Sequence, residues 1–325
     1  MFKALLKSAV ILVLAAAAFL AYGLLLPATP SQRSVMLRPG SSARTIASEL
    51  RDAGVIRSRY AFLALHYFRV KPLKAGEYLF DHPANAFEIY NRLVHGDIVI
   101  HTVVVPEGFN LWDIAGGFEA SGLATRAEFL DAARKNHAMI NDLDPSAQSL
   151  EGYLFPDTYR FTRTQSLTDM LTVMTRHFRQ EAKAIGLNSD FHKVVTMASI
   201  VEKETGAPEE RPLVAGVYYN RLGNGMLLGA DPTVVYAALL ANRYNGVIHQ
   251  SDLDSTSPYN TYRVAGLPPG PIANPGRASL AAALRPQQTD YLYFVSDNNG
   301  HHRFARSGAE HDRNVALYRH STAGR

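Results

Sequence analysis

Hydrophobic and polar residues divide the chain into an apolar N-terminal run and a long region of mixed pattern. Residues 8–26 carry no charge and are rich in Ala, Leu and Val. A helix needs about 20 such residues to cross a bilayer. Pro27 and Pro30 end the predicted helix. Lys3 and Lys7 precede it, which predicts a single-pass anchor whose N-terminus stays in the cytoplasm.

A cleaved signal peptide is the alternative for this run. The apolar part of a signal peptide is typically about 7–15 residues, and small residues follow it at the cleavage site. Here the run is longer, and the small-residue tract 15–18 lies inside it. We therefore assign residues 1–30 to a cytoplasmic tip and a transmembrane anchor. No second run approaches this length, so we expect the remainder to be a body outside the cytoplasmic membrane.

The region after the anchor, residues 31–148, contains a weak internal repeat. Residues 35–55 align without gaps on residues 103–123, with Val, two Gly, Ile and Ala identical. Each copy predicts a short strand, a Gly turn and an amphipathic helix, with Ser42 and Asn110 as N-caps. This pattern resembles half of a LysM glycan-binding module, although any α+β protein can contain such units. Between the copies we expect a strand over 75–80 and a helix over 86–94.

Residues 149–325 change in composition and form the third predicted region. The fold class that we predict for the body is α+β, with LysM-like subdomains followed by a mostly helical domain. The helices are expected over 167–184, 191–203, 212–222, 231–240 and 278–284. The extended segments are expected over 153–161, 291–296 and 302–305, with a turn at 298–300 and a Gly/Pro/Asn loop over 255–276.

Composition and absent motifs narrow the chemistry. The 325 residues carry a net charge of +4, spread along the chain, which argues against nucleic acid as a partner. The absence of Cys excludes disulfides, thiolate metal sites and cysteine nucleophiles. The sequence also lacks His-Glu-x-x-His, a P-loop, a Gly-x-Ser-x-Gly elbow and a dinucleotide fingerprint. We therefore expect neither a metal nor a cofactor.

The most informative helix ends in the sequence Glu-Lys-Glu-Thr-Gly. Glu204 shares a face with the apolar Met197 and Ile200, and it lies near the C-terminus of the helix, with Gly206 as the expected C-cap. Desolvation and the helix dipole both raise the pKa of such a carboxyl group. A protonated carboxyl is the acid that cleavage of a glycosidic bond needs. Glu202 on the neighbouring stripe is the competing candidate, and a solvated helix end is the non-catalytic alternative.

Seven motifs in order make the chain similar to the endolytic murein transglycosylase (YceG-like) family. They are EGYLFPDTY (151–159), ASIVEKET (198–205), NRL (220–222), DPTVVY (231–236), YNTY (259–262), GLPPGPI (266–272) and YLYFV (291–295). The resemblance covers nearly the whole chain, including the anchor and the LysM-like part. It implies cleavage of peptidoglycan glycan strands at the outer face of the inner membrane, beside glycan polymerases. It also places the essential Glu of the family on Glu204.

The implied mechanism needs one carboxyl group. Glu204 protonates the oxygen between a muramyl C1 and the next glucosamine, and the resulting carboxylate then takes the proton of the muramyl C6 hydroxyl as that oxygen attacks C1. The product is a 1,6-anhydromuramyl end. The family often has a Gln and a hydroxyl residue where this chain has Gly229 and Ala230. Polar substrate contacts from these two positions are therefore in question.

The remaining candidate residues each allow two interpretations. Asp231 is either the N-cap of its helix or a substrate contact, and Asn220 either binds sugar hydroxyls or caps the preceding helix. Tyr259, Asn260 and Tyr262 either form the floor of a glycan groove or pack in the core. A hydrolytic muramidase and a non-catalytic, membrane-anchored glycan-binding scaffold remain the alternative functions.

Overall fold

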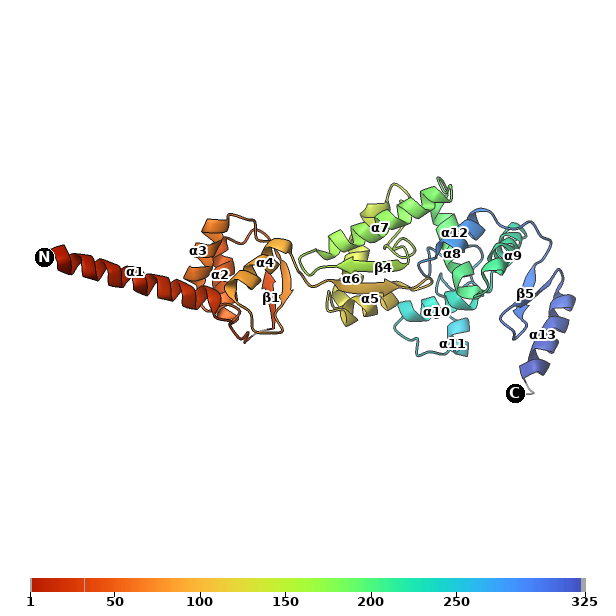
Figure 1. The fold of residues 1–325 in the computed structure, drawn as a ribbon. Helices are drawn as coiled ribbons and strands as arrows, with labels where there is room; N and C mark the ends of the chain where they lie inside the picture. Colours follow the sequence, from red (N-terminus) through yellow and green to blue (C-terminus); the bar gives the residue numbers. More distant parts are fainter. Residues whose placement is uncertain (1, 32, 323–325) are drawn as a thin grey trace. The chain divides into compact units, whose positions relative to one another are not determined.

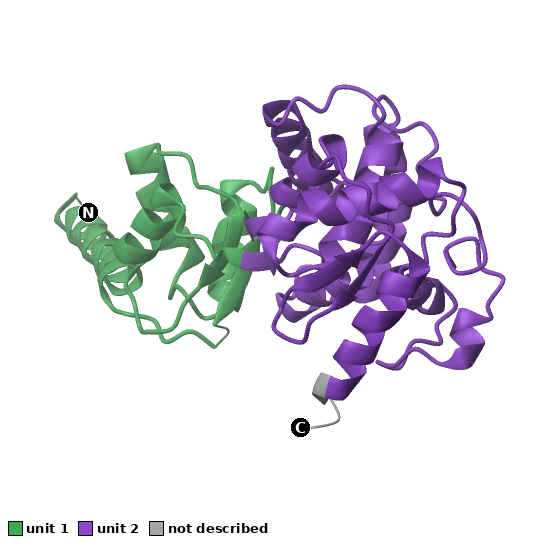
Figure 2. Cartoon of the chain, turned by 90° about the vertical axis from the view of Figure 1, so that its right-hand side faces the viewer, with its two compact units in different colours: residues 1–101, 160–166 green, residues 102–159, 167–325 purple. Residues whose placement is uncertain are grey.

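The computed structural model describes residues 2–31 and 33–322, and it confirms a mixed α+β fold that is mostly helical. The chain forms two compact units (Figure 2). Unit 1 comprises Met1–His101 and Arg160–Ser166, and unit 2 comprises Thr102–Tyr159 and Leu167–Arg325. These units describe the packing of the chain. The division into a repeat region, 31–148, and a catalytic region, 149–325, stays a prediction.

Unit 1 is built from helices around a two-stranded antiparallel sheet. Its elements are α1 (Phe2–Leu25), β1 (Ser34–Leu37), α2 (Ala43–Asp52), α3 (Arg59–Arg69), β2 (Gly76–Leu79) and α4 (Ala86–His95). Val35 of β1 lies opposite Tyr78 of β2, and both side chains are buried. Leu50 and Phe62 bring α2 and α3 into the same core. Unit 1 therefore has a hydrophobic core of its own.

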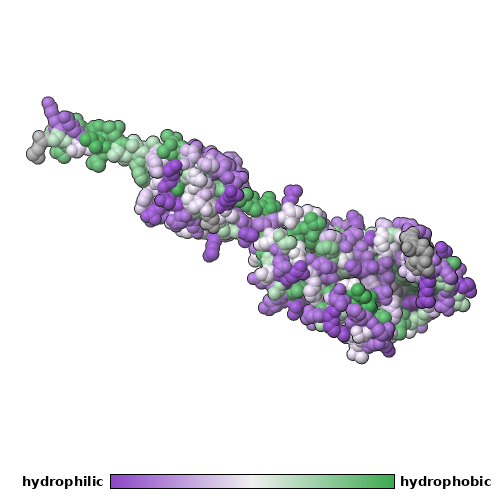
Figure 3. Space-filling model, turned by 90° about the horizontal axis from the view of Figure 1, so that it is seen from below, coloured by the Kyte–Doolittle hydropathy of each residue, from purple (hydrophilic) through white to green (hydrophobic). Residues whose placement is uncertain are grey.

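Helix α1 ends at Leu25, before Pro27, as the sequence predicts. Its apolar side chains are almost all exposed along its length (Figure 3). Its last turn is different, because Gly23 is buried against α3. A Cβ added at Gly23 would lie 2.6 Å from the Cβ of Ala61, so a larger residue does not fit there. The helix is long and apolar enough to cross a membrane.

Both copies of the internal repeat form a strand, a turn and a helix. In the first, β1 leads through Gly40 to α2, and Ser42 accepts a hydrogen bond from the backbone N–H of Thr45. In the second, which lies largely in unit 2, β3 (His101–Val105) leads through Gly108 to α5 (Leu111–Ala120). Gly40 and Gly108 have φ values of 80° and 78°, which glycine adopts without strain. Whether the copies act as LysM-like modules stays a prediction.

Unit 2 surrounds a central buried helix, α8 (Phe191–Glu204), which packs against α12, α9 and α10 (Figure 1). The strands are β4 (Asp157–Phe161), which pairs with β3, and the antiparallel pair β5 (Tyr293–Ser296) and β6 (His302–Ala305). The other helices are α6 (Arg126–Lys135), α7 (Leu167–Ala184), α9 (Arg211–Gly223), α10 (Asp231–Leu240), α11 (Gln250–Leu253), α12 (Arg277–Leu284) and α13 (Gly308–Thr322). Short 3-10 helices span His137–Ile140 and Pro208–Glu210.

The structure differs from the sequence-based prediction at several helices. Four α-helices, α3, α6, α11 and α13, were not predicted. The expected C-cap at Gly206 is also wrong. The cap position is Thr205, which is extended with φ −130° and ψ 130°, and Gly206 does not have a positive φ. The chain therefore leaves α8 directly in an extended conformation and needs no left-handed residue.

Candidate active site

Helix α8 carries Glu204 to the edge of the core of unit 2. The preceding side chains, from Val194 to Val201, are all buried. Glu204 is the last helical residue, so its carboxyl group lies beside the unsatisfied carbonyls of the last turn. This position is electrostatically unfavourable for a negative charge. The apolar face that was read from the sequence therefore places this carboxyl group where a neutral form is favoured.

A buried tyrosine of α9 holds one oxygen of this carboxyl group. The hydroxyl of Tyr218 donates a hydrogen bond to Oε1 of Glu204 at 2.7 Å, and Tyr218 is only 2% exposed. The Tyr218 ring is fixed by an edge-on contact with Phe294 of β5, at 5.6 Å between ring centroids. Since the contact occupies Oε1, the second oxygen of Glu204 remains free to carry and deliver a proton.

A second carboxylate comes from the first turn of α10. The interpretation of Asp231 as an N-cap is wrong, because Ala230 occupies the cap position and no side chain caps this helix. Asp231 instead accepts a hydrogen bond on Oδ1 from the hydroxyl of Tyr262, at 2.6 Å. Gly229, two residues before Asp231, has no side chain, and the methyl group of Ala230 is fully buried. Neither of these two residues offers a polar side chain to a ligand.

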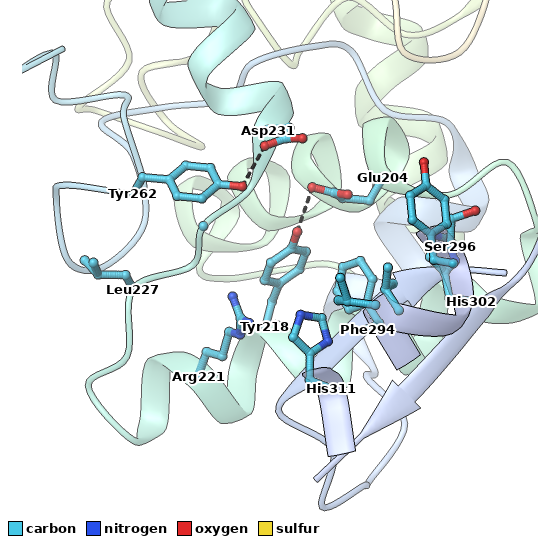
Figure 4. A pocket seen from close by; sticks show the side chains of 14 residues that line it. Glu204, Tyr218, Arg221, Leu227, Asp231, Tyr262, Phe294, Ser296, His302 and His311 are labelled. Carbon is cyan, nitrogen blue, oxygen red and sulfur yellow. Dashed lines mark hydrogen bonds between the residues drawn. The ribbon is translucent and has the colours of Figure 1, made fainter. Parts of the chain in front are cut away.

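Glu204 and Asp231 line the same open cavity, which has a volume of about 640 Å³. Figure 4 shows their carboxyl groups held from separate sides by Tyr218 and Tyr262. The rest of the lining is Arg221, Leu227, Gly229, Phe294, Val295, Ser296, His302, His311, Val315 and Tyr318. A cavity of this size accommodates a sugar unit and leaves both carboxyl groups accessible to it.

The environment of Glu204 raises the pKa of its carboxyl group to about 7. Burial is the main cause, and the negative charge of Asp231 adds to it. The Tyr218 hydrogen bond and the positive charge of Arg221 oppose the rise, because both favour the carboxylate. Glu204 therefore holds its proton at a higher pH than an ordinary carboxyl group does. This is the property that a general acid requires.

Glu202, the competing carboxylate, faces a different part of the molecule. Its Oε1 pairs with Arg211 at 2.9 Å, and its Oε2 accepts a hydrogen bond from the backbone N–H of Gly276 at 2.9 Å. Nearby, Ser199 accepts a hydrogen bond from the backbone N–H of Ile272 at 3.0 Å. These contacts attach the end of the Pro/Gly-rich loop to α8. Glu202 does not line the Glu204 cavity, and its two oxygens are both engaged in these contacts.

Asn220 and Arg221 join α9 to the segment that leads into β5. The Asn220 amide donates to the carbonyls of Thr289 and Tyr291, at 2.7 and 3.0 Å. Arg221 donates to the carbonyls of Leu228 and Leu292, and its guanidinium also lines the cavity. The helix-capping interpretation of Asn220 is wrong, because α9 ends at Gly223 and Asn224 occupies the C-cap position. Sugar binding by Asn220 stays a prediction.

The three candidates of the YNTY segment separate into different roles. Asn260 is fully buried, and its amide donates to the carbonyls of Leu253 and Ser255, at 2.9 and 2.8 Å. Tyr259 packs against the ring of Tyr236, at 5.0 Å between centroids. Only Tyr262 lines the Glu204 cavity. The segment therefore combines core packing with one contact at the site.

The sequence reasoning missed the wall of the cavity formed by β5, β6 and α13. His302 of β6 is held by Glu210, whose Oε2 lies 2.6 Å from its Nδ1. His311 of α13 stacks on Tyr293, at 5.2 Å between centroids. Burial and the charge of Arg221 lower the pKa of His311, so its ring is neutral near pH 7. The sequence signals for this wall were the YLYFV motif, whose Phe294 and Val295 line the cavity, and the extended segments expected over 291–296 and 302–305. The sequence reasoning did not connect them with the Glu204 site.

The fold and the cavity define an α+β protein whose candidate site contains a carboxyl group of raised pKa at the end of a buried helix. Residues 35–317 match the model of the YceG-like family. A crystal structure of a yceG-like protein from Listeria monocytogenes superposes with a TM-score of 0.57 at 34% identity, covering 86% of this chain and 97% of that one. The chain therefore belongs to the YceG-like family, as its motifs indicate.

Two relatives carry the name endolytic murein transglycosylase. The protein of Bacillus subtilis (strain 168) is 33% identical over 309 residues, which cover 88% of this chain and 84% of that protein. The protein of Streptococcus pneumoniae serotype 2 (strain D39 / NCTC 7466) is 31% identical over 319 residues, which cover 87% of this chain. The match spans only 58% of the streptococcal protein.

Proposed function

We propose that this protein is an endolytic murein transglycosylase, which cleaves the bond between N-acetylmuramic acid and N-acetylglucosamine within peptidoglycan strands. The observation that carries the proposal is the Glu204 carboxyl group, whose pKa is raised to about 7 in an open cavity. The names of the relatives agree with this activity. The products would be strands with 1,6-anhydromuramyl ends.

Glu204 would act first as an acid and then as a base. Its proton moves to the bridging oxygen, the C1–O bond breaks with its electron pair on that oxygen, and positive charge develops at C1. The muramyl C6 oxygen then forms a bond to C1, and its proton returns to Glu204. Because the nucleophile belongs to the same sugar, its effective concentration is high and no water is consumed. Tyr218 fixes the carboxyl group during both steps through the hydrogen bond to Oε1.

A hydrolytic muramidase is the second candidate, and one observation favours it. Asp231 places a second carboxylate in the cavity of Glu204, and hydrolytic glycosidases use a second carboxylate to activate water or to bind C1. The product decides between the two reactions. Transglycosylation leaves ends that are lighter by one water molecule than the reducing muramic ends that hydrolysis leaves.

The test is product analysis with the full-length protein in detergent and purified sacculi. We expect anhydromuramyl ends by mass spectrometry. We expect Glu204→Gln to lower the rate by at least about 100-fold, since general acid catalysis contributes about 10²–10⁴-fold. Glu209→Gln is the matched control, because the Glu209 side chain is 65% exposed and outside the cavity. Full activity of Glu204→Gln would refute the assignment of Glu204 as the acid. An inactive Glu204→Gln variant that still complements a deletion strain would favour the scaffold function.

The location and domain roles belong to the same proposal. Helix α1 would anchor the protein in the inner membrane with the N-terminus in the cytoplasm, and the catalytic body would lie in the periplasm. Residues 31–148 would hold glycan through the LysM-like repeat, and residues 149–325 would carry out cleavage. Acting beside peptidoglycan synthases, the enzyme would end the elongation of nascent strands.

A further inference from the structure

A second groove adjoins the Glu204 cavity. It has a volume of about 450 Å³ and lies between the start of α5, the end of α8 and one face of α10. Its lining includes Asp113, Lys203, Asp231, Val235, Leu239 and Tyr244. Asp231 lines both hollows, and Lys203 immediately precedes Glu204. A polymer bound at Glu204 can therefore continue around the start of α10 into this α5–α10 groove.

The α5–α10 groove offers an accessible positive charge. Lys203 is exposed, and its ammonium donates to the carbonyl of Gly108 at 3.3 Å. An ammonium has three donors, so this contact leaves others for a ligand. Asp113 belongs to the capping box of α5, in which its Oδ2 accepts a hydrogen bond from the backbone N–H of Asn110. The groove also contains the carboxylates of Asp113 and Asp231, so Lys203 is the one charged group of its lining that can pair with an anion.

The opposite wall of the α5–α10 groove is aliphatic and aromatic. Val235 and Leu239 lie one turn apart on α10 and are half-buried, and Tyr244 follows the helix with 37% of its surface exposed. The Tyr236 hydroxyl is turned away from the groove, because it donates to the buried Glu151 at 3.1 Å. The wall therefore suits alkyl groups, and the groove as a whole suits a ligand with both a carboxylate and short alkyl side chains.

We infer that the α5–α10 groove binds the stem peptide of a muramic sugar next to the cleaved bond, with a peptide carboxylate paired to Lys203. This inference rests on the proposed function. Along a peptidoglycan strand the N-acetylglucosamine units are uncharged, whereas the peptides on the muramic units carry carboxylates and aliphatic side chains. An ammonium beside an apolar wall matches the peptide and gives no advantage for a neutral sugar.

The test compares two substrates with the full-length protein and a Lys203→Gln variant. One substrate is glycan strands with their stem peptides, and the other is the same strands after an amidase has removed the peptides. We expect Lys203→Gln to lower kcat/KM about tenfold on peptide-bearing strands, the size expected for losing a partly solvated charge-assisted hydrogen bond. We expect less than about a twofold change on stripped strands, because the pair would be absent there. Lys203→Arg should restore cleavage of peptide-bearing strands.

Lys183→Gln provides a matched control, since Lys183 is an exposed lysine of α7 outside both hollows. An equal loss on both substrates, or no loss on either, would overturn the peptide-binding role of Lys203. Free stem peptide gives an independent readout. It should inhibit cleavage by the unaltered enzyme and inhibit Lys203→Gln about tenfold less. If the unaltered enzyme cleaves neither substrate, the proposed function itself fails; if it cleaves both and Lys203→Gln behaves like Lys183→Gln, only this inference fails.

Discussion

Two features of the Glu204 environment have opposite effects on the pKa of its carboxyl group: burial, and the hydrogen bond from Tyr218. Burial raises the pKa of the Glu204 carboxyl group to about 7, and the Tyr218 hydrogen bond restrains that rise. The pKa of Tyr218 is itself raised by burial and by the charge of Glu204, so the hydroxyl remains a donor. The proposed cleavage would require protonated Glu204, and activity should therefore fall as the pH rises through about 7.

The Tyr218→Phe variant tests this arrangement. Its removal of the hydrogen bond should raise the pKa of Glu204 further, so the falling limb of kcat/KM should move to higher pH. The measurement is a pH–rate profile on purified glycan strands. Tyr219→Phe is the matched control, because the Tyr219 hydroxyl donates to the carbonyl of Ala283, away from the cavity. An unchanged limb in Tyr218→Phe would contradict the role of this hydrogen bond.

At the level of single residues, the sequence located the candidate acid but not the groups that surround it. The position of Glu204 follows from helical spacing, which is a local property of the chain. Its partners Tyr218 and Asp231 lie on two other helices, and only tertiary packing brings them to the same cavity. The mistaken N-cap role of Asp231 has the same origin, because a local capping pattern could not account for a hydrogen bond to Tyr262, far along the chain.

Among the secondary structure elements, α5, α10 and the Pro/Gly-rich loop meet at a buried carboxyl group. Glu151 is 3% exposed, and it accepts hydrogen bonds from the Leu111 backbone, Tyr236 and Asn274. Burial raises its pKa to about 8. The folded state therefore keeps a proton that an unfolded chain, with an ordinary carboxyl pKa of about 4.3, releases at lower pH. Glu151 thus holds Tyr236, which lines the α5–α10 groove, and its protonation contributes to the stability of unit 2.

The expected consequence is a loss of stability with rising pH. Between about pH 5 and 8 the folded state binds more protons at Glu151 than the unfolded state does, so stability falls as the pH increases. Glu151→Gln should show a shallower fall in Tm over this range, because the amide does not titrate. At pH 5 the Tm of this variant should be lower than that of the unaltered protein. The reason is that an N–H of the new amide would face a hydrogen-bond donor, such as the backbone N–H of Leu111.

Thermal unfolding followed by circular dichroism at several pH values measures this effect. The exposed Glu209→Gln variant should keep the slope of the unaltered protein. A steep fall that persists unchanged in Glu151→Gln would assign the pH dependence to other groups.

The secondary structure was predictable where the hydrophobic period was strong. Helices α7 and α10 begin and end at the predicted residues. Helix α13 was missed because its sequence has no clear apolar stripe, and its contacts with β5 and β6 exist only in the folded protein. Helix α6 did carry a local signal, the capping box between Thr125 and Glu128, which the sequence reasoning did not use.

At the scale of the whole molecule, α1 is either an uncleaved membrane anchor, as we propose, or a cleaved signal peptide. An uncleaved anchor should keep the protein in the membrane pellet after alkaline extraction, because about 20 apolar residues are buried in the bilayer. The measurement is fractionation of a protein with an epitope tag at each end. Both tags should remain on one chain in the pellet. Separation of the N-terminal tag from the body would instead show a cleaved signal peptide.

The buried Gly23 has a consequence for the proposed membrane anchor. Because α1 packs tightly on α3 before it ends, its last turn is part of the folded unit 1. Arg57 strengthens this attachment by donating to the Tyr22 hydroxyl and to the carbonyl of Pro27. With α1 embedded in a bilayer, unit 1 would be mounted on the membrane surface at a fixed height and could not swing freely on a flexible tether. The distance from the lipid at which unit 1 meets a growing strand would then be set by the protein itself.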